Sequence, residues 1–123
     1  MIARATALAL AAALALPAAA AAKERRFHTP SGNIHCLYAS SGPFLRCDVL
    51  SLNDTAFTLD RRHRGKRVHV TDSVFGSHSR TLAYGDSIRL GAFRCTSRRA
   101  GLTCRSKPSG HGFRLSRHRQ TVF

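Results

Sequence analysis

Acidic residues are scarce in this chain of 123 residues, which has six Asp and Glu against 20 Lys and Arg. The only glutamate is Glu24, so the sequence gives little support to the paired carboxylates that glycosidases use. It contains no G-x-S-x-G nucleophile motif and no phosphate-binding P-loop. These absences exclude several common enzyme classes and leave a strongly basic protein.

A helical hydrophobic period is also missing after residue 22, where no window of eleven residues keeps one. Short alternating runs occupy residues 67–71, 81–90 and 113–116, and the second contains turn residues at 84–87. The pattern predicts an all-β fold, a small sandwich or open barrel built from short hairpins. The predicted core is formed by Phe27, Ile34, Tyr38, Leu45, Val49, Phe57, Val68, Val70, Leu82, Tyr84, Ile88, Leu90, Phe93, Leu102, Phe113 and Leu115.

The first 22 residues have the composition of a secretory signal. Arg4 supplies a positive charge, residues 5–16 are almost entirely apolar, and the alanines at 18–22 offer cleavage sites. An uncleaved anchor is the alternative, but a membrane-spanning helix needs about 20 apolar residues. We therefore expect a cleavable signal helix over residues 1–22 and a single small β domain over residues 23–123. No transmembrane span would remain, and the mature domain would be periplasmic or secreted.

Removal of the signal makes the chain more polar. Loss of Arg4 lowers the formal net charge from +14 to +13, and about a third of the remaining residues are apolar. Such a composition lies near the border of disorder, so we expect covalent cross-links to support the fold. All four cysteines follow the signal, as in exported disulfide proteins. The alternative, four thiolates on one zinc ion, lacks a C-x-x-C pair and a reducing compartment.

Turn residues predict which cysteines pair. A hairpin about the loop at residues 40–43 places Cys36 opposite Cys47, and the same register places His35 opposite Asp48. Directly opposed strand residues are close enough for a disulfide. We therefore predict a bridge between Cys36 and Cys47.

A second hairpin about residues 98–101 places Cys95 opposite Cys104 and Arg94 opposite Arg105. We predict a second disulfide between these two cysteines. Closing a loop of about ten residues contributes roughly 2.5 to 3 kcal/mol to stability, which is a large share for a small domain.

Five short motifs occur in order along the chain: TPSGNIHC at 29–36, LAYG at 82–85, FRCTS at 93–97, GLTC at 101–104 and GHGFRLSR at 110–117. Together they resemble a family of small secreted bacterial proteins of uncharacterised function. The resemblance implies export and a compact β domain, and it implies no particular reaction.

Basic residues cluster most densely at residues 61–67. Guanidinium groups match phosphate and sulfate, although such a loop also serves simply to keep a protein in solution. Opposed arginines in the second hairpin cost stability unless an anion or solvent separates them. The predicted anion-binding residues are Arg61, Arg62, Arg64, Lys66, Arg67, Arg94 and Arg105.

Three residues are candidates for proton-transfer chemistry. Two glycines flank His111 and leave its imidazole accessible, unless the segment is only a turn. His35 opposite Asp48 is either an oriented acid–base pair or a cross-strand ion pair. His69 and His78 lack a third ligand at a suitable spacing, so we expect no metal site.

These observations favour an exported, non-catalytic domain whose basic face binds an anionic partner: an envelope polymer, a lipid headgroup, a nucleic acid or an acidic protein. We expect it to be a monomer without a cofactor. One alternative is a metal-independent ribonuclease using His35 or His69 with His111 and Lys107. Another is an inhibitor of an acidic foreign enzyme, since charge repulsion disfavours a cationic target.

Overall fold

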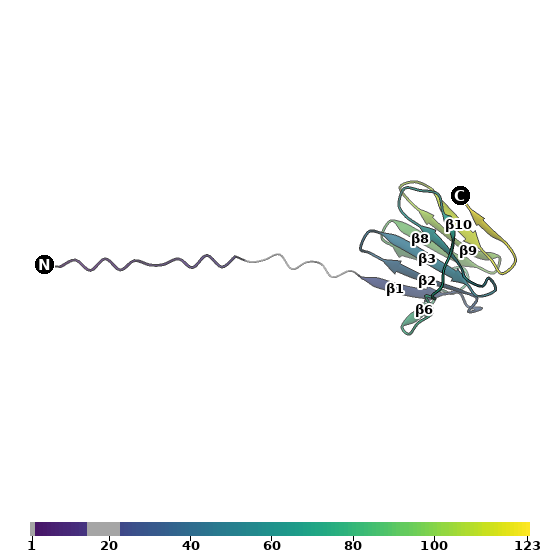
Figure 1. Ribbon diagram of the computed structural model, residues 1–123, viewed down its shortest axis with the longest axis horizontal. Coiled ribbons are helices and arrows are strands. Elements are labelled where there is room, and N and C mark those ends of the chain that lie inside the picture. The colour runs from purple at the N-terminus through teal and green to yellow at the C-terminus, as the bar shows by residue number, and fades with distance from the viewer. Residues whose placement is uncertain (1, 15–22) are drawn as a thin grey trace.

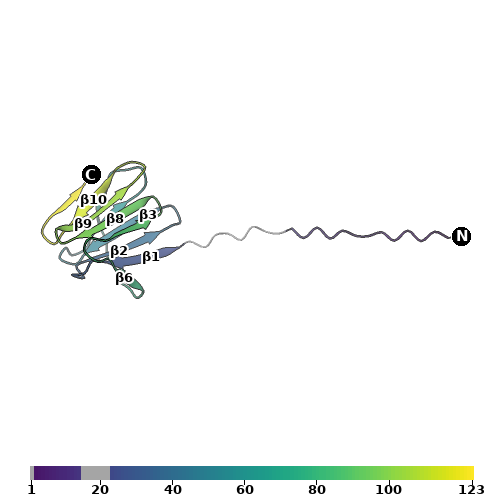
Figure 2. The same cartoon turned by 180° about the vertical axis from the view of Figure 1, so that it is seen from behind.

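The computed structural model of the protein describes residues 2–14 and 23–123, and in these residues it is an all-β fold (Figure 1). Sheet A has the strand order β5-β4-β3-β2-β1-β6, and sheet B has the order β11-β10-β9-β8-β7. The strands are β1 (Glu24–His28), β2 (Ile34–Ala39), β3 (Phe44–Val49), β4 (Thr55–Leu59), β5 (Lys66–His69), β6 (Ser79–Thr81), β7 (Ser87–Leu90), β8 (Phe93–Arg98), β9 (Gly101–Ser106), β10 (Gly112–Leu115) and β11 (Gln120–Val122). Both cartoon views place β6 and residue 123 at opposite sides of the sandwich (Figures 1 and 2).

Both predicted hairpins form in the predicted register. Strands β2 and β3 pair Cys36 with Cys47, and strands β8 and β9 pair Cys95 with Cys104. The Cα atoms of each pair lie 4.1 Å apart and each pair is joined by a disulfide, so both bridges are confirmed.

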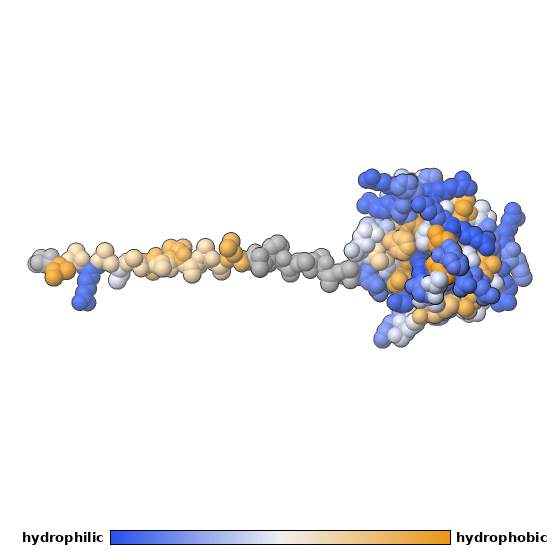
Figure 3. Space-filling view, viewed as in Figure 1, coloured by the Kyte–Doolittle hydropathy of each residue, from blue (hydrophilic) through white to orange (hydrophobic). Residues whose placement is uncertain are grey.

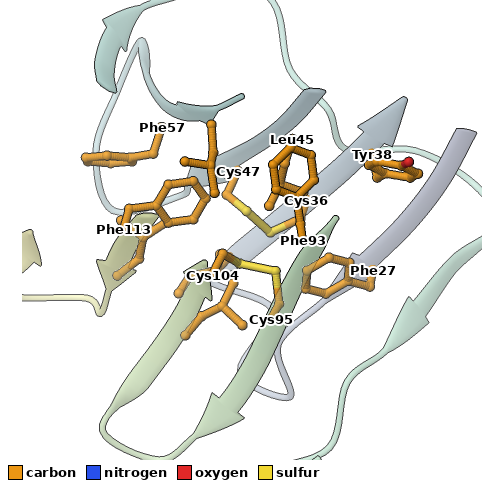
Figure 4. Packing of buried hydrophobic residues seen from close by; sticks show 14 of the residues in the cluster. Phe27, Cys36, Tyr38, Leu45, Cys47, Phe57, Phe93, Cys95, Cys104 and Phe113 are labelled. Atoms are coloured by element: carbon orange, nitrogen blue, oxygen red, sulfur yellow. A yellow bond between two sulfur atoms is a disulfide. The ribbon is translucent and has the colours of Figure 1, made fainter. Parts of the chain in front are cut away.

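The core lies between the two sheets. The inward positions of each strand alternate with outward ones, as in β2 and β8, where every second residue is buried. Both disulfides are among the inward side chains and lie on facing sides of the core (Figure 4). Four buried phenylalanines fill the space around the sulfur atoms: Phe27, Phe57, Phe93 and Phe113.

Three predicted core residues were wrong. Val68 lies on β5, which is an edge strand of sheet A, and Val70 follows that strand, so both are only half-buried. Tyr84 is 39% exposed, in a turn that links the two sheets. The sequence pattern also missed Leu59 and Val74, which are buried.

Residues 70–78 form a strap across the outer face of sheet A. The strap is required because β5 and β6 lie at opposite edges of that sheet. Arg46 donates to the carboxylates of Asp48 and Asp72, each at 2.9 Å. The amide of Val74 donates to Asp48 at 3.0 Å, which holds the middle of the strap on the sheet.

Residues 2–14 are exposed and have no regular secondary structure, and they are apolar apart from Arg4 and Thr6 (Figure 3). The cleavage region expected at residues 18–22 lies outside the described residues, so the export signal stays a prediction. Within the described part of the chain, no helix is long and apolar enough to cross a membrane.

Candidate anion-binding face

Three arginines form a line across the outer surface of sheet B. The strand register places Arg89 opposite Arg94 and Arg94 opposite Arg105, on the three adjacent strands β7, β8 and β9. All three side chains are exposed. Neighbouring strands are about 4.8 Å apart, so the line extends for about 10 Å. We call these three residues the arginine row.

The arginine row has no carboxylate partner within residues 2–14 and 23–123. Ion pairs in that part of the chain join Arg26 to Glu24, Arg46 to Asp48 and Asp72, and His63 to Asp60. All of these residues precede sheet B, and no acidic residue follows Asp86, whereas nine Lys and Arg do. Opposed like charges destabilise a sheet unless solvent or an anion separates them.

Next to the arginine row lies a parallel line of hydroxyl groups and one further arginine, Arg114. The register connects Ser87, Thr96, Thr103, Arg114 and Thr121 across all five strands of sheet B. Hydroxyl groups both donate and accept hydrogen bonds. We call the arginine row together with this line the basic face.

A groove of about 580 Å³ lies at the edge of the basic face. Its lining residues are Ala100, Arg114, Ser116, Arg119, Thr121 and Phe123. The Phe123 ring lies 5.2 Å from the guanidinium carbon of Arg105, in a cation–π contact. Phe123 exchanges two backbone hydrogen bonds with Gly112, which hold the end of the chain beside β10.

The predicted cationic loop is held in a fixed shape by Asp60. The Asp60 carboxylate accepts hydrogen bonds from the amides of Arg62 at 2.8 Å and His63 at 2.7 Å. These backbone bonds, first that of His63, lower the pKa of Asp60 to about 2. A carboxylate inside the loop offsets part of its positive charge, which the sequence reasoning did not consider.

The same loop is attached to sheet B through residues at the end of β11. Gly65 donates its amide to the carbonyl of Phe123 at 3.1 Å, and Arg64 donates to the carbonyl of Val122 at 3.0 Å. The tertiary fold thus places the loop beside Phe123 and Arg105, although these segments are far apart in sequence.

The structure divides the predicted anion-binding set. Arg94 and Arg105 belong to the basic face, and Arg61, Arg62 and Arg64 lie in the attached loop. Lys66 and Arg67 instead lie on β5 in sheet A, and the Arg67 guanidinium is 5.8 Å from the buried Phe57 ring. The predicted anion-binding set did not include Arg89 and Arg114, which the strand register places on the basic face.

His35 and Asp48 are register partners, but their side chains hydrogen-bond elsewhere. The imidazole Nε2 of His35 lies 2.9 Å from the carbonyl oxygen of Gly32, while Asp48 is engaged by Arg46 and the strap. Burial lowers the pKa of His35 from its usual value of 6.5. The geometry therefore does not form the acid–base pair considered from the sequence.

His111 lies in the connection between β9 and β10, half-buried, with its amide donating to Ser109 at 3.3 Å. His35 lies on the outer face of sheet A, so the two histidines do not share a sheet. Within residues 2–14 and 23–123, no three His, Cys, Asp or Glu side chains are grouped to hold a metal ion.

The fold and the basic face define a small β-sandwich with two cross-strand disulfides and one strongly cationic sheet surface. The chain belongs to a family of unknown function, DUF6636, whose family model matches residues 43–123. The matched region contains the whole basic face and begins after β2. No curated protein and no solved structure matches the chain.

Proposed function

We propose that the protein is an exported, non-catalytic domain that binds an anionic polymer through the basic face. The arginine row carries this proposal, because its three opposed guanidinium groups have no carboxylate partner in the described residues. The two disulfides fit an oxidising compartment, and we place the domain in the periplasm or the surrounding medium.

A polymer suits this surface better than a small anion. The cations are spread over four adjacent strands, so one small anion cannot contact them all. A chain with repeated negative charges contacts several arginines together and releases counterions as it binds. Envelope polymers and nucleic acids share this property, whereas binding to a lipid headgroup or to an acidic protein would be a different function.

The test uses protein purified after export and two labelled polymers, a single-stranded RNA and a polyphosphate, in EDTA across a salt series. Contacts from Arg89, Arg94, Arg105 and Arg114 predict a slope of log affinity against log salt of about −3, at roughly 0.7 per contact. Arg94→Gln with Arg105→Gln should reduce the slope by about 1.4. The control, Lys23→Gln with Arg80→Gln, removes the same charge from β6 and from the residue that precedes β1, and it should leave the slope nearly unchanged.

Three results would contradict the proposal. One is the absence of salt-dependent retention of either polymer. Another is RNA cleavage that His111→Ala abolishes, which would support the ribonuclease alternative. The third is saturable binding to one acidic protein with little salt dependence, which would support the inhibitor alternative.

A further inference from the structure

A second site lies at one end of the sandwich, away from the arginine row. Turns and hairpins from both sheets meet there around a pocket of about 200 Å³. Its lining includes Asn33, Tyr84 and the three arginines Arg98, Arg99 and Arg117. Four of the five motifs noted in the sequence contribute to this lining: TPSGNIHC, LAYG, GLTC and GHGFRLSR. We call it the end pocket.

Three arginines give the end pocket a strong positive charge. The guanidinium groups of Arg98, Arg99 and Arg117 are exposed, and none donates to a protein acceptor within residues 23–123. The Arg99 guanidinium carbon lies 5.1 Å from the centre of the Tyr84 ring, so a cation–π contact orients it at the pocket. No acidic side chain is part of the lining.

A buried asparagine supplies a second, independent observation. Asn33 is 6% exposed, and its Oδ1 accepts a hydrogen bond from the amide of Ser51 at 3.2 Å. Its backbone carbonyl accepts from Leu50 at 2.7 Å, so the residue is firmly held. The amide nitrogen Nδ2 donates to no acceptor in the described part of the chain, and it keeps some solvent access, since Ser97 Oγ is the fully buried side-chain polar atom without a partner there. Because Asn33 lines the end pocket, a ligand oxygen in the pocket can accept a hydrogen bond from Nδ2.

From this lining we propose that the end pocket binds a phosphomonoester group. Guanidinium forks and an amide N–H all donate, which matches an ion whose oxygens only accept. A phosphomonoester carries nearly two negative charges at neutral pH, and three unpaired cations favour it over a singly charged carboxylate. The volume is below the 300 to 1,000 Å³ typical of sites for drug-sized ligands, so the pocket suits a small group. This inference goes beyond the polymer binding proposed above and uses different residues.

The test is calorimetric titration of the exported protein with inorganic phosphate and with methyl phosphate, at about 150 mM salt. We expect saturable binding at one site. Arg117→Gln should weaken it about 10- to 100-fold, which corresponds to loss of a hydrogen bond between charged groups. The matched control is Arg119→Gln, two residues along, which removes the same charge from the same turn but does not line the end pocket.

A second variant, Asn33→Asp, keeps an acceptor for the Ser51 amide and replaces the Nδ2 donor with a negative charge. It should abolish phosphate binding, and a melting curve will show whether the domain still folds. If Asn33→Asp does not fold, the proposal is tested by comparing the phosphate affinity of Arg117→Gln with that of Arg119→Gln. The absence of one-site binding would overturn the proposal, as would equal weakening by these two arginine variants.

Two further comparisons are needed. One distinguishes a lipid headgroup from a free phosphomonoester as the ligand, and the other tests the end pocket independently of polymer binding. Loss of binding to phosphatidic acid vesicles in Arg117→Gln would assign the site to a lipid headgroup, whereas binding of methyl phosphate without vesicle binding would assign it to a free monoester. Either result supports the end pocket. Arg94→Gln with Arg105→Gln should change the phosphate affinity by no more than about twofold. The phosphate test therefore remains valid even if the protein does not bind the polymers.

Discussion

Removal of the disulfide in sheet B should cost the domain a large part of its stability. The bridge joins residues nine apart in sequence, and closure of such a loop contributes about 2.6 kcal/mol by the chain-entropy relation. Both cysteines are fully buried between the sheets, so truncation also leaves a cavity. For Cys95→Ala with Cys104→Ala we expect a loss of about 3 to 4 kcal/mol in total, against a typical stability of about 5 to 15 kcal/mol.

Urea unfolding of the exported protein and the variant, followed by circular dichroism, measures this loss. The control is Thr96→Ala with Thr103→Ala, a neighbouring cross-strand pair in the same hairpin, which should cost less than about 1 kcal/mol. In thermal melts the closure term alone corresponds to a decrease in Tm of about 10 to 20 °C. The reasoning is refuted if the cysteine variant loses no more stability than the threonine variant.

Three further substitutions test the packing and the pH dependence. Ser97→Ala should raise the free energy of unfolding by about 1 kcal/mol, because the buried Ser97 hydroxyl has no hydrogen-bond partner among the described residues. A clear decrease in the free energy of unfolding, measured with urea, would contradict this. Gly112→Ala should cost about 2 to 3 kcal/mol, since its Cβ would collide with the carbonyl oxygen of Cys104, and an unchanged unfolding midpoint would disprove the collision. Burial lowers the pKa of His35 in the folded state, so the unfolded chain takes up a proton more readily than the folded one. The folded state is therefore favoured by neutral His35 above pH 6.5, and this part of the free energy of unfolding is lost as the pH falls below that value. Free energies of unfolding between pH 5.5 and 7.5 should therefore decline on acidification less in His35→Gln than in the unaltered protein, and equal slopes would exclude this role.

Much of the fold follows from short-range pattern. Alternation and turn residues predicted the β2–β3 and β8–β9 hairpins in the correct register and both disulfides. These features depend on residues about ten apart, where loop length alone determines which side chains face each other. Val68 and Val70 were misplaced because alternation cannot distinguish an edge strand from a central one.

The candidate site could be predicted only in part. Opposition of Arg94 and Arg105 followed from the hairpin alone, but Arg89 and Arg114 join them through strand pairings with β7 and β10. The contacts of Asp48 were also predicted only in part. Its cross-strand partner His35 was predicted correctly, but the Asp48 carboxylate binds Arg46 and the strap instead. The strap comes from a distant segment, which no local sequence pattern places beside Asp48.

The all-β class, the two cystine hairpins and the excess of positive charge after Asp86 follow directly from the sequence, because each depends on composition or on near neighbours. Other features come from the packing of the whole domain: β5 and β6 occupy opposite edges of sheet A, and the cationic loop is attached beside Phe123. The meeting of four separate motifs around the end pocket is a third such feature. These arrangements join segments tens of residues apart, and their proximity comes from burying both sheets against one core rather than from any local preference.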